Sequence, residues 1–210
     1  MSDDKKIKKD HLTLQLLDAI DRQGEVSQRH LAKQMGVALG LANSYLKRCI
    51  RTGYVKISQV PANRYLYYLT PTGFAEKSRL TSRYLSYSFS FYREASDSCA
   101  RVFDKCRSNG WNEIVLCGVS DLAEIASLRA IEMEIDVIGV FDTGTKCERV
   151  VKKPVYRTLA EVPACHAFVV TELVSPADTY RVLVSQYDDG RVLVPSILRF
   201  DAGPDQGGNV

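Results

Sequence analysis

Four polar residues lie close together in a stretch whose spacing is otherwise typical of an amphipathic helix. They are Asn43, Ser44, Lys47 and Arg48. Amide, hydroxyl and cationic side chains of this kind hydrogen-bond to the bases and phosphates of duplex DNA. We expect Asn43 to pair with adenine, Lys47 and Arg48 to reach guanine or phosphate, and Ser44 to contact phosphate. The pattern therefore predicts a helix face that enters the major groove of double-stranded DNA.

Two helices separated by a short turn are needed to present such a face. Ser27 can cap a first helix that carries Leu31 and Met35 on one side, and Gly36 interrupts it. A second helix, ended by Gly53, is predicted from an apolar stripe. That stripe consists of Leu39, Ala42, Leu46, Cys49 and Ile50.

A hairpin is predicted directly after the second helix. Residues 54–60 and 64–70 are rich in β-branched and aromatic side chains, and Pro61-Ala62-Asn63 separates them. Helix, turn, helix and hairpin is the order of a winged helix-turn-helix. Arg64 stands at the wing, where a cation can enter the minor groove, and Gln28 is placed to contact phosphate.

Residues 27–80 resemble the MarR-type transcriptional regulators associated with exopolysaccharide gene clusters. The resemblance covers about a quarter of the chain and implies a transcription regulator that binds DNA, with genes for polysaccharides or sugar nucleotides as targets. The alternative is a winged helix used only for protein contacts. The matching residues are Leu31-Ala32, Gly36-Val37, Leu39-Gly40, Asn43, Tyr45-Leu46-Lys47, Gly53-Tyr54-Val55-Lys56 and Leu69-Thr70-Pro71-Thr72-Gly73.

Charge is divided unevenly between the two halves of the sequence. Residues 1–110 contain 19 Lys and Arg against 10 Asp and Glu, a net +9. Residues 111–210 contain 9 against 15, a net −6. A basic first half fits a phosphate-binding surface, whereas an acidic second half is not expected to touch DNA.

Composition indicates a globular protein of one or two domains. The 210 residues are 45% hydrophobic and 25% charged. The charged residues 1–10 do not form a signal peptide, and no apolar run is long enough to span a bilayer, so we expect a cytoplasmic protein with no membrane contact. The six cysteines form no CxxC pair, no histidine lies at metal spacing from them, and no metal site is predicted. Cys147 is the one candidate for a reactive thiol.

A second group of residues has the order of a β-α-β unit. Residues 113–117 form an apolar run before Gly118, Ser120 and Ala123, and a helix then leads to a strand over residues 136–141 that ends at Asp142. The first three residues occupy the positions of the small residues in a nucleotide-binding turn, G-x-G-x-x-G/A. Asp142 follows Gly118 by 24 positions, near the spacing at which an acid contacts a ribose hydroxyl. These four are candidate ligand-binding residues for a nucleotide or nucleotide sugar.

That turn departs from the full pattern. Ser120 has a Cβ where the backbone should approach a pyrophosphate, and Asp121, expected to cap the helix with Glu124, would repel one. These residues are compatible with two roles for the C-terminal half, a sensor for a small-molecule effector or an assembly domain without ligand. An enzyme of nucleotide-sugar or dinucleotide chemistry is the alternative function, although no catalytic residue is found, because no base and nucleophile are paired.

A long helix is predicted between the two halves, because no Pro or Gly occurs from Phe74 to Asn109. Its apolar residues recur at spacings of three and four, which predicts a seam that pairs with a second copy in a homodimer. The alternative is a helix packed on its own C-terminal domain. The seam consists of Leu85, Phe89, Tyr92, Ala95, Cys99, Val102 and Cys106.

The expected fold class is α/β overall. A winged helix-turn-helix occupies residues 1–80, with its first helix over residues 12–22 after a mobile start. A connecting and dimerisation helix occupies residues 81–110, and a small parallel-sheet, Rossmann-like domain occupies residues 111–200. Further strands are predicted near residues 155–156, 166–171 and 191–194, with a helix over residues 176–187. Residues 201–210 are expected to be a disordered tail.

Overall fold

The computed structural model describes residues 2–22, 27–60 and 64–200. The predicted turn Pro61-Ala62-Asn63 and the predicted tail lie outside these residues. Contacts divide the chain into two compact units, Met1–Phe89 and Ser90–Val210. The domain boundaries predicted at residues 80 and 110 stay a prediction.

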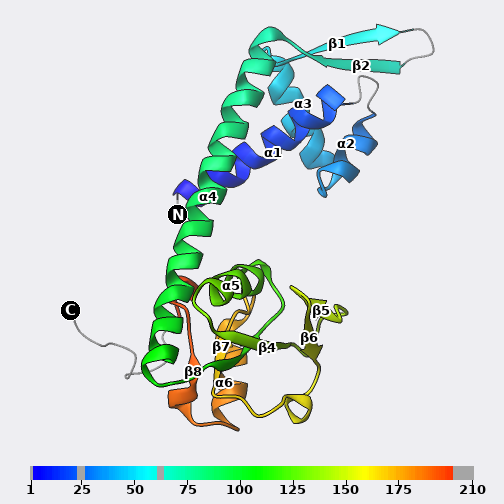
Figure 1. The fold of residues 1–210 in the computed structure, drawn as a ribbon. Helices are drawn as coiled ribbons and strands as arrows, with labels where there is room; N and C mark the ends of the chain where they lie inside the picture. Colours follow the sequence, from blue (N-terminus) through cyan, green and yellow to red (C-terminus); the bar gives the residue numbers. More distant parts are fainter. Residues whose placement is uncertain (1, 23–26, 61–63, 201–210) are drawn as a thin grey trace. The chain divides into compact units, whose positions relative to one another are not determined.

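The N-terminal unit is a winged helix-turn-helix, as predicted (Figure 1). Helix α1 (Ser2–Arg22) precedes α2 (Gln28–Gln34) and α3 (Leu39–Arg51). Strands β1 (Val55–Val60) and β2 (Arg64–Leu69) form the antiparallel wing. Helix α4 (Pro71–Ser108) starts in this unit.

The described part of α1 starts at Ser2, ten residues before the predicted start of the first helix at residue 12. Two residues of this added part lie against α4. Arg83 of α4 forms an ion pair with Asp10 at 2.7 Å, and Ile7 lies beside α4 as well. Lys77 of α4 binds Asp18 at 2.9 Å and Asp21 at 2.6 Å, and its hydrogen bond holds the pKa of Asp18 below the usual value. Contacts of α1 with α4 at Ile7 and Asp10 thus favour the helix near its start.

Apolar faces of α1, α2, α3 and the base of the wing form the core of this unit. Ser27 caps α2 as predicted, because its Oγ accepts a hydrogen bond from the amide of His30. Among the most deeply buried side chains are Leu16, Leu17, Ile20, Leu31, Ala42, Leu46, Cys49, Val55 and Tyr67.

A compact joint connects the end of α3, the end of β2 and the start of α4. We define it as Gly53, Tyr54, Thr70, Thr72 and Gly73. Thr70 Oγ1 donates to the carbonyl of Gly53 at 2.6 Å and accepts from the amide of Gly73 at 3.0 Å. A Cβ added at Gly73 would lie 2.0 Å from the carbonyl oxygen of Tyr54. The two chain segments therefore meet with no room for a side chain.

Helix α4 is continuous, but the predicted dimer seam along it is wrong for its C-terminal half. Ala95, Cys99, Val102 and Cys106 are buried in the core of the C-terminal unit, as the alternative prediction had it. Burial raises the pKa of the Cys99 thiol to about 12, so this cysteine behaves as a small apolar residue. The other three seam residues are exposed: Leu85, Phe89 and Tyr92.

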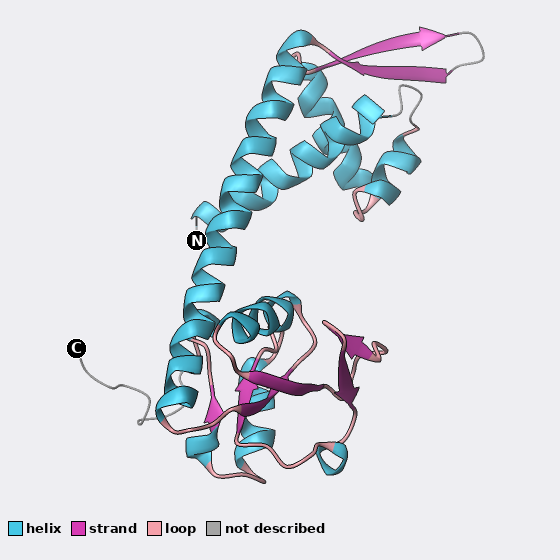
Figure 2. Cartoon of the chain, in the orientation of Figure 1, coloured by secondary structure: helices cyan, strands magenta, loops and turns pink. Residues whose placement is uncertain are grey.

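The C-terminal unit is built on a six-stranded sheet with the order β5-β6-β4-β3-β7-β8 (Figure 2). All neighbours pair in parallel except β5 and β6, so the predicted parallel α/β fold is confirmed. The strands are β3 (Glu113–Cys117), β4 (Asp136–Phe141), β5 (Arg149–Val150), β6 (Lys153–Tyr156), β7 (Ala167–Val170) and β8 (Val192–Leu193).

Helices cover both faces of this sheet. One core contains side chains of α4 and α5 (Asp121–Glu132), and the other contains side chains of α6 (Pro176–Val184). Helix α6 ends before its predicted end at residue 187. Strand β5 was not predicted, because it has two residues and its turn to β6 uses Val151 and Lys152 at positive φ instead of glycine. None of the described helices is both long and apolar enough to cross a membrane.

Candidate nucleic-acid interface and sheet edge

Helix α3 exposes a polar face opposite its buried stripe. Gly40, Ser44, Lys47 and Arg51 are spaced by four, three and four residues, so they lie along one side of the helix, and all four are exposed. Lys47 and Arg51 form no ion pair with the described residues. The centre of this face therefore offers a hydroxyl and two unpaired cations to an anionic partner.

Asn43 and Arg48 lie on the two flanks of this face and not at its centre. Asn43 is half-buried, and its Oδ1 is buried without a hydrogen-bond partner among the described residues. A bidentate amide–adenine pair needs both the oxygen and the nitrogen of this side chain, and the adenine contact stays a prediction. Arg48 is half-buried too. Together with Arg79, which has the larger effect through its hydrogen bond, it lowers the pKa of Glu76 on α4.

Arg51 is the residue of this face that the sequence interpretation missed. In the sequence, Arg51 is interpreted as a cation at the C-terminal end of a helix, where the helix dipole favours positive charge. The signal that identifies it is its phase, because it follows Lys47 by four positions and Ser44 by seven.

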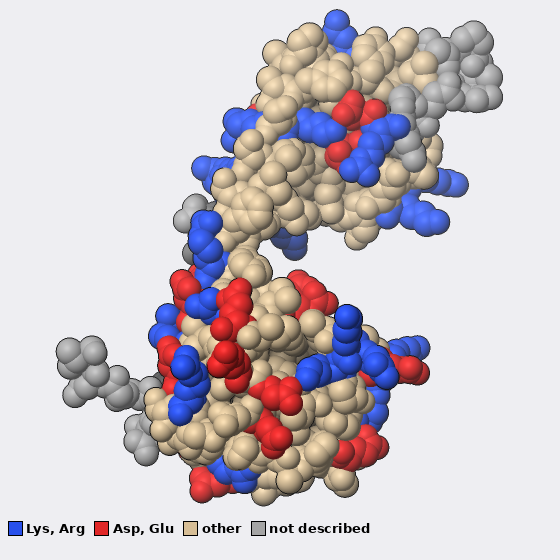
Figure 3. All heavy atoms as spheres, in the orientation of Figure 1, with Lys and Arg blue, Asp and Glu red and all other residues tan. Residues whose placement is uncertain are grey.

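The other two predicted DNA contacts lie outside α3. Gln28 is exposed at the start of α2, and its Nε2 donates to the hydroxyl of Tyr67 at 3.2 Å. Arg64 is the first residue of β2, and its side chain lies outside the described residues. Figure 3 shows acidic residues gathered mainly over the C-terminal unit and basic ones prominent on the N-terminal unit. Exposed cations of the helix-turn-helix and wing include Arg29, Lys33, Lys47, Arg51 and Lys56.

The predicted ligand-binding residues of the C-terminal unit do come together at the carboxyl edge of the sheet. Asp142 Oδ2 accepts a hydrogen bond from the amide of Val119 at 2.7 Å. Its Oδ1 accepts from the amides of Gly144 and Thr145 at 2.8 and 2.9 Å. The carboxylate expected to bind a ribose diol is therefore already bonded to three amides of its own chain.

Ser120 also differs from its predicted role. Its Oγ accepts a hydrogen bond from the amide of Ala123 and donates to the carbonyl of Thr171 at 2.6 Å. Ser120 is thus the N-cap of α5, and the prediction that Asp121 caps this helix is wrong. The same hydroxyl ties the turn after β3 to the end of β7.

Gly118 is required by a close approach within the chain. Its φ is +109°, and an added Cβ would lie 2.5 Å from the amide nitrogen of Glu172. The backbone after β7 therefore occupies the space that the glycine leaves open. In a nucleotide-binding turn the first glycine serves the tight turn, and here the same position also accommodates the backbone of Glu172.

Cys147 is exposed, in agreement with its predicted position in a polar loop. The Sγ atom of Cys147 lies 2.9 Å from the carbonyl oxygen of Arg149. The guanidinium of Arg157 donates a hydrogen bond to the carbonyl of Cys147 at 2.7 Å. Across the described ranges, no three His, Cys, Asp or Glu side chains are grouped so that they could hold a metal ion.

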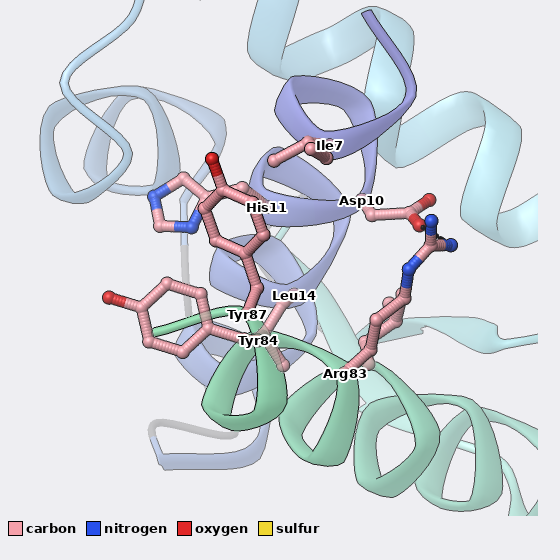
Figure 4. Close-up of a pocket in the computed structure, with 8 residues that line it drawn as sticks. Ile7, Asp10, His11, Leu14, Arg83, Tyr84 and Tyr87 are labelled. Carbon is pink, nitrogen blue, oxygen red and sulfur yellow. Dashed lines mark hydrogen bonds and ion pairs between the residues drawn. The ribbon is translucent and has the colours of Figure 1, made fainter. Parts of the chain in front are cut away.

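A cavity of about 180 Å³ lies between α1 and α4 in the N-terminal unit. Figure 4 shows Tyr84, Tyr87 and His11 at one side of it and the ion pair of Asp10 and Arg83 at the other. The rings of His11 and Tyr84 have centroids 5.5 Å apart. The remaining lining is apolar, with Ile7, Leu14 and Leu80.

Comparison with known proteins assigns the first part of the chain. Residues 9–56 match the family of winged helix-turn-helix DNA-binding domains. The chain therefore contains a winged helix-turn-helix DNA-binding domain. A search of curated proteins gives no match.

Similar solved structures include regulators and a methyltransferase. The PcaV transcriptional regulator from Streptomyces coelicolor is 24% identical over 47% of this chain and 72% of its own, with a TM-score of 0.37. The regulator MepR from Staphylococcus aureus is 16% identical over 51% and 91%, with a TM-score of 0.37. The O-methyltransferase NcsB1 from neocarzinostatin biosynthesis is 13% identical over 90% and 81%, with a TM-score of 0.36.

Proposed function

We propose that this chain is a cytoplasmic, dimeric and sequence-specific regulator of transcription, and not an enzyme. The observation that supports this most is the exposed face of α3, where Ser44, Lys47 and Arg51 lie in a winged helix-turn-helix DNA-binding domain. In such a domain the second helix lies in the major groove. Lys47 then reaches a base edge or phosphate, and Ser44 and Arg51 contact phosphates, with Gln28 and Arg64 as secondary contacts.

A gel-shift series on genomic fragments tests this proposal. Fragments from genes for polysaccharide synthesis belong in the set, because the MarR-type resemblance suggests them as targets. A specific complex should form, and its affinity should fall steeply as salt rises from about 50 to 200 mM, because binding displaces counterions from DNA. The absence of any salt-sensitive complex would contradict the proposal.

The C-terminal unit is included in the proposal as a domain that binds no nucleotide effector at the carboxyl edge of its sheet. The support is that Asp142, Ser120 and Gly118 are engaged by the chain's own amides, carbonyls and backbone. A nucleotide effector would have to displace these contacts before it could bind. The predicted effector is therefore not retained at this edge of the sheet.

Asp142→Ala distinguishes the two interpretations. The substitution leaves three amides without their acceptor, so the C-terminal unit should lose about 1–3 kcal/mol of stability. Chemical unfolding measures this, with Asp178→Ala, which removes an exposed ion pair to Arg181, as the matched control. Calorimetry of the unsubstituted protein with NAD(H), nucleotide sugars and S-adenosylmethionine should give no heat. Heat that disappears in Asp142→Ala or Asp142→Asn would restore the sensor.

The homodimer in this proposal uses the part of α4 that lies in the N-terminal unit. Leu85 and Phe89 are four residues apart on one side of the helix and are 45% and 57% exposed. Tyr84 and Tyr87, at the rim of the α1–α4 cavity, are about as exposed. The two tyrosines lie on the side of α4 that faces α1, so the surface proposed for a second copy is centred on Leu85 and Phe89.

Leu85→Glu combined with Phe89→Glu should convert the dimer to a folded monomer. A carboxylate placed in an apolar interface loses its hydration without gaining a partner. Both side chains are half exposed in the single chain, so its own fold should tolerate the change. Light scattering measures the mass, and Ser108→Glu with Asn112→Glu, at two exposed positions of the C-terminal unit, adds the same charge away from this surface as a control. A full-size dimer of the double variant would place the interface elsewhere.

A further inference from the structure

The hydroxyl of Thr70 connects two helices through a single oxygen. It accepts a hydrogen bond from Gly73 in the first turn of α4 and donates to the carbonyl of Gly53, two residues after the end of α3. Thr72 reinforces the contact, because its hydroxyl donates to the same carbonyl at 3.0 Å and lies 2.8 Å from that of Thr70. Thr70 is 8% exposed, so water has little access to this oxygen.

A threonine that only caps its helix would not need the second bond. Capping is complete when the hydroxyl accepts from an amide in the first turn, which here is the amide of Gly73. The hydroxyl has one proton to donate, and the 2.6 Å bond to Gly53 uses it. Thr70 therefore joins the chain end of α3 to the chain start of α4, in addition to capping.

The packing around the Thr70 hydrogen bond leaves little freedom for α3 to rotate relative to α4. The amide of Thr70 donates to the carbonyl of Tyr54 at 3.0 Å, and Gly73 lies against that carbonyl too closely for a Cβ. Further along α4, Lys77 and Arg83 are tied to α1 by ion pairs. A rotation of helix α3 about its C-terminal end relative to α4 would strain or break the Thr70 bond.

We propose that Thr70 is a positioning residue for DNA recognition, which fixes the orientation of α3 relative to α4. The inference rests on the proposed function, in which α4 carries the dimer contact and α3 enters the groove. In a dimer, the angle between these helices sets the distance between the two recognition helices. That distance must match the spacing of the two half-sites on DNA.

Thr70→Val is the main test, because valine keeps the shape and removes the hydroxyl. Affinity for the specific site should fall by about tenfold, the usual effect of one lost hydrogen bond on an equilibrium, while non-specific affinity stays within about twofold. Thr70→Val should also distinguish less strongly than the unsubstituted protein between the natural site and sites with one base pair added or removed between the half-sites. Thr70→Ser, which restores the hydroxyl, should restore both properties.

Thr52→Val is the matched control. Its hydroxyl is also at the end of α3, but among the described residues it donates to the carbonyls of Arg48 and Cys49 of the same helix. Thr52→Val should leave the preference for half-site spacing unchanged, although loss of the Thr52 hydroxyl also removes hydrogen bonds. Thr72→Val gives a milder change at the joint itself, with a loss of about two- to threefold, and it keeps the test available if Thr70→Val folds poorly.

Hydrogen exchange at the amide of Gly73 tests the Thr70 hydrogen bond itself, independently of DNA binding. Thr70→Val should speed this exchange in the free protein, because the acceptor of that amide is gone. Unchanged exchange would overturn the inference, and so would unchanged spacing discrimination in a folded, DNA-binding Thr70→Val or an equal loss in Thr52→Val. If the unsubstituted protein binds no DNA, the proposed function fails and the positioning role with it, whatever the exchange shows.

Discussion

Replacing Lys47 and Arg51 together by alanine is expected to remove specific DNA binding while the protein stays folded. Both side chains are exposed at the centre of the polar face of α3 and have no ion-pair partner among the described residues, so their loss should not disturb the core. A base contact by Lys47 is worth about 1–3 kcal/mol. Each lost phosphate contact should also reduce the slope of log affinity against log salt by about one, so the pair should reduce it by about two.

Lys105→Ala with Arg107→Ala is the matched control for this experiment. It removes the same charge from exposed positions in the last turn of α4, within the C-terminal unit. Its affinity and salt slope should stay close to those of the unsubstituted protein. If Asn43→Ala with Arg48→Ala weakens binding more than the Lys47 and Arg51 pair does, the flanks of α3 read the DNA and the assignment of its face is wrong.

Gly73→Ala is expected to have the largest effect on stability. The added Cβ would lie 2.0 Å from the carbonyl oxygen of Tyr54 and 2.9 Å from its carbonyl carbon. Both are backbone atoms, so the contact is relieved only if the joint opens. Alanine is intrinsically better in a helix by about 1 kcal/mol, but overpacking of this severity costs about 3 kcal/mol or more. The N-terminal unit should therefore unfold at a clearly lower denaturant concentration.

The single tryptophan allows the two units to be followed separately. Trp111 lies in the C-terminal unit, so its fluorescence should report a nearly unchanged transition while the helical circular dichroism shows the early one. Gly40→Ala is the control, because its Cβ would meet no atom within 4 Å and should stabilise α3 by up to about 1 kcal/mol. Equal stability of Gly73→Ala and Gly40→Ala would contradict the close contact at the joint.

Periodicity was enough to predict most of the secondary structure. The apolar stripe through Ala42, Leu46 and Cys49 defines α3, and glycines end both helices of the motif. Alternating helices and apolar strands likewise predict the parallel sheet. Such patterns record which side of an element is buried, and burial is what dominates folding.

Periodicity could not identify what covers a buried side. The spacing of Ala95, Cys99 and Val102 is the same for a coiled-coil seam as for a stripe packed on the chain's own domain, which is what the structure has. The rotational phase of α3 was the second source of difficulty. Asn43 and Arg48 lie near the boundary of the exposed face of α3, where a small rotation decides between solvent and interior.

Sequence spacing also predicted proximity at the sheet edge, but not whether the space was free. Gly118 and Asp142 do lie on adjoining turns, as their separation indicated. The approach of Glu172 to Gly118 joins residues 54 positions apart, and no local pattern reveals such a contact. A degraded nucleotide-binding turn and a turn filled by its own chain therefore look alike in sequence.

The filled sheet edge has a consequence for how this domain could change during evolution. Restoring a full glycine pattern by Ser120→Gly would remove the cap of α5 and the bond to Thr171, yet the backbone at Glu172 would still stand against Gly118. Removing the Asp142 side chain would free the three amides that it binds, but it would not clear the space beside Gly118 that Glu172 occupies. A nucleotide pocket is therefore several coordinated substitutions away, including a change in the path of the chain after β7.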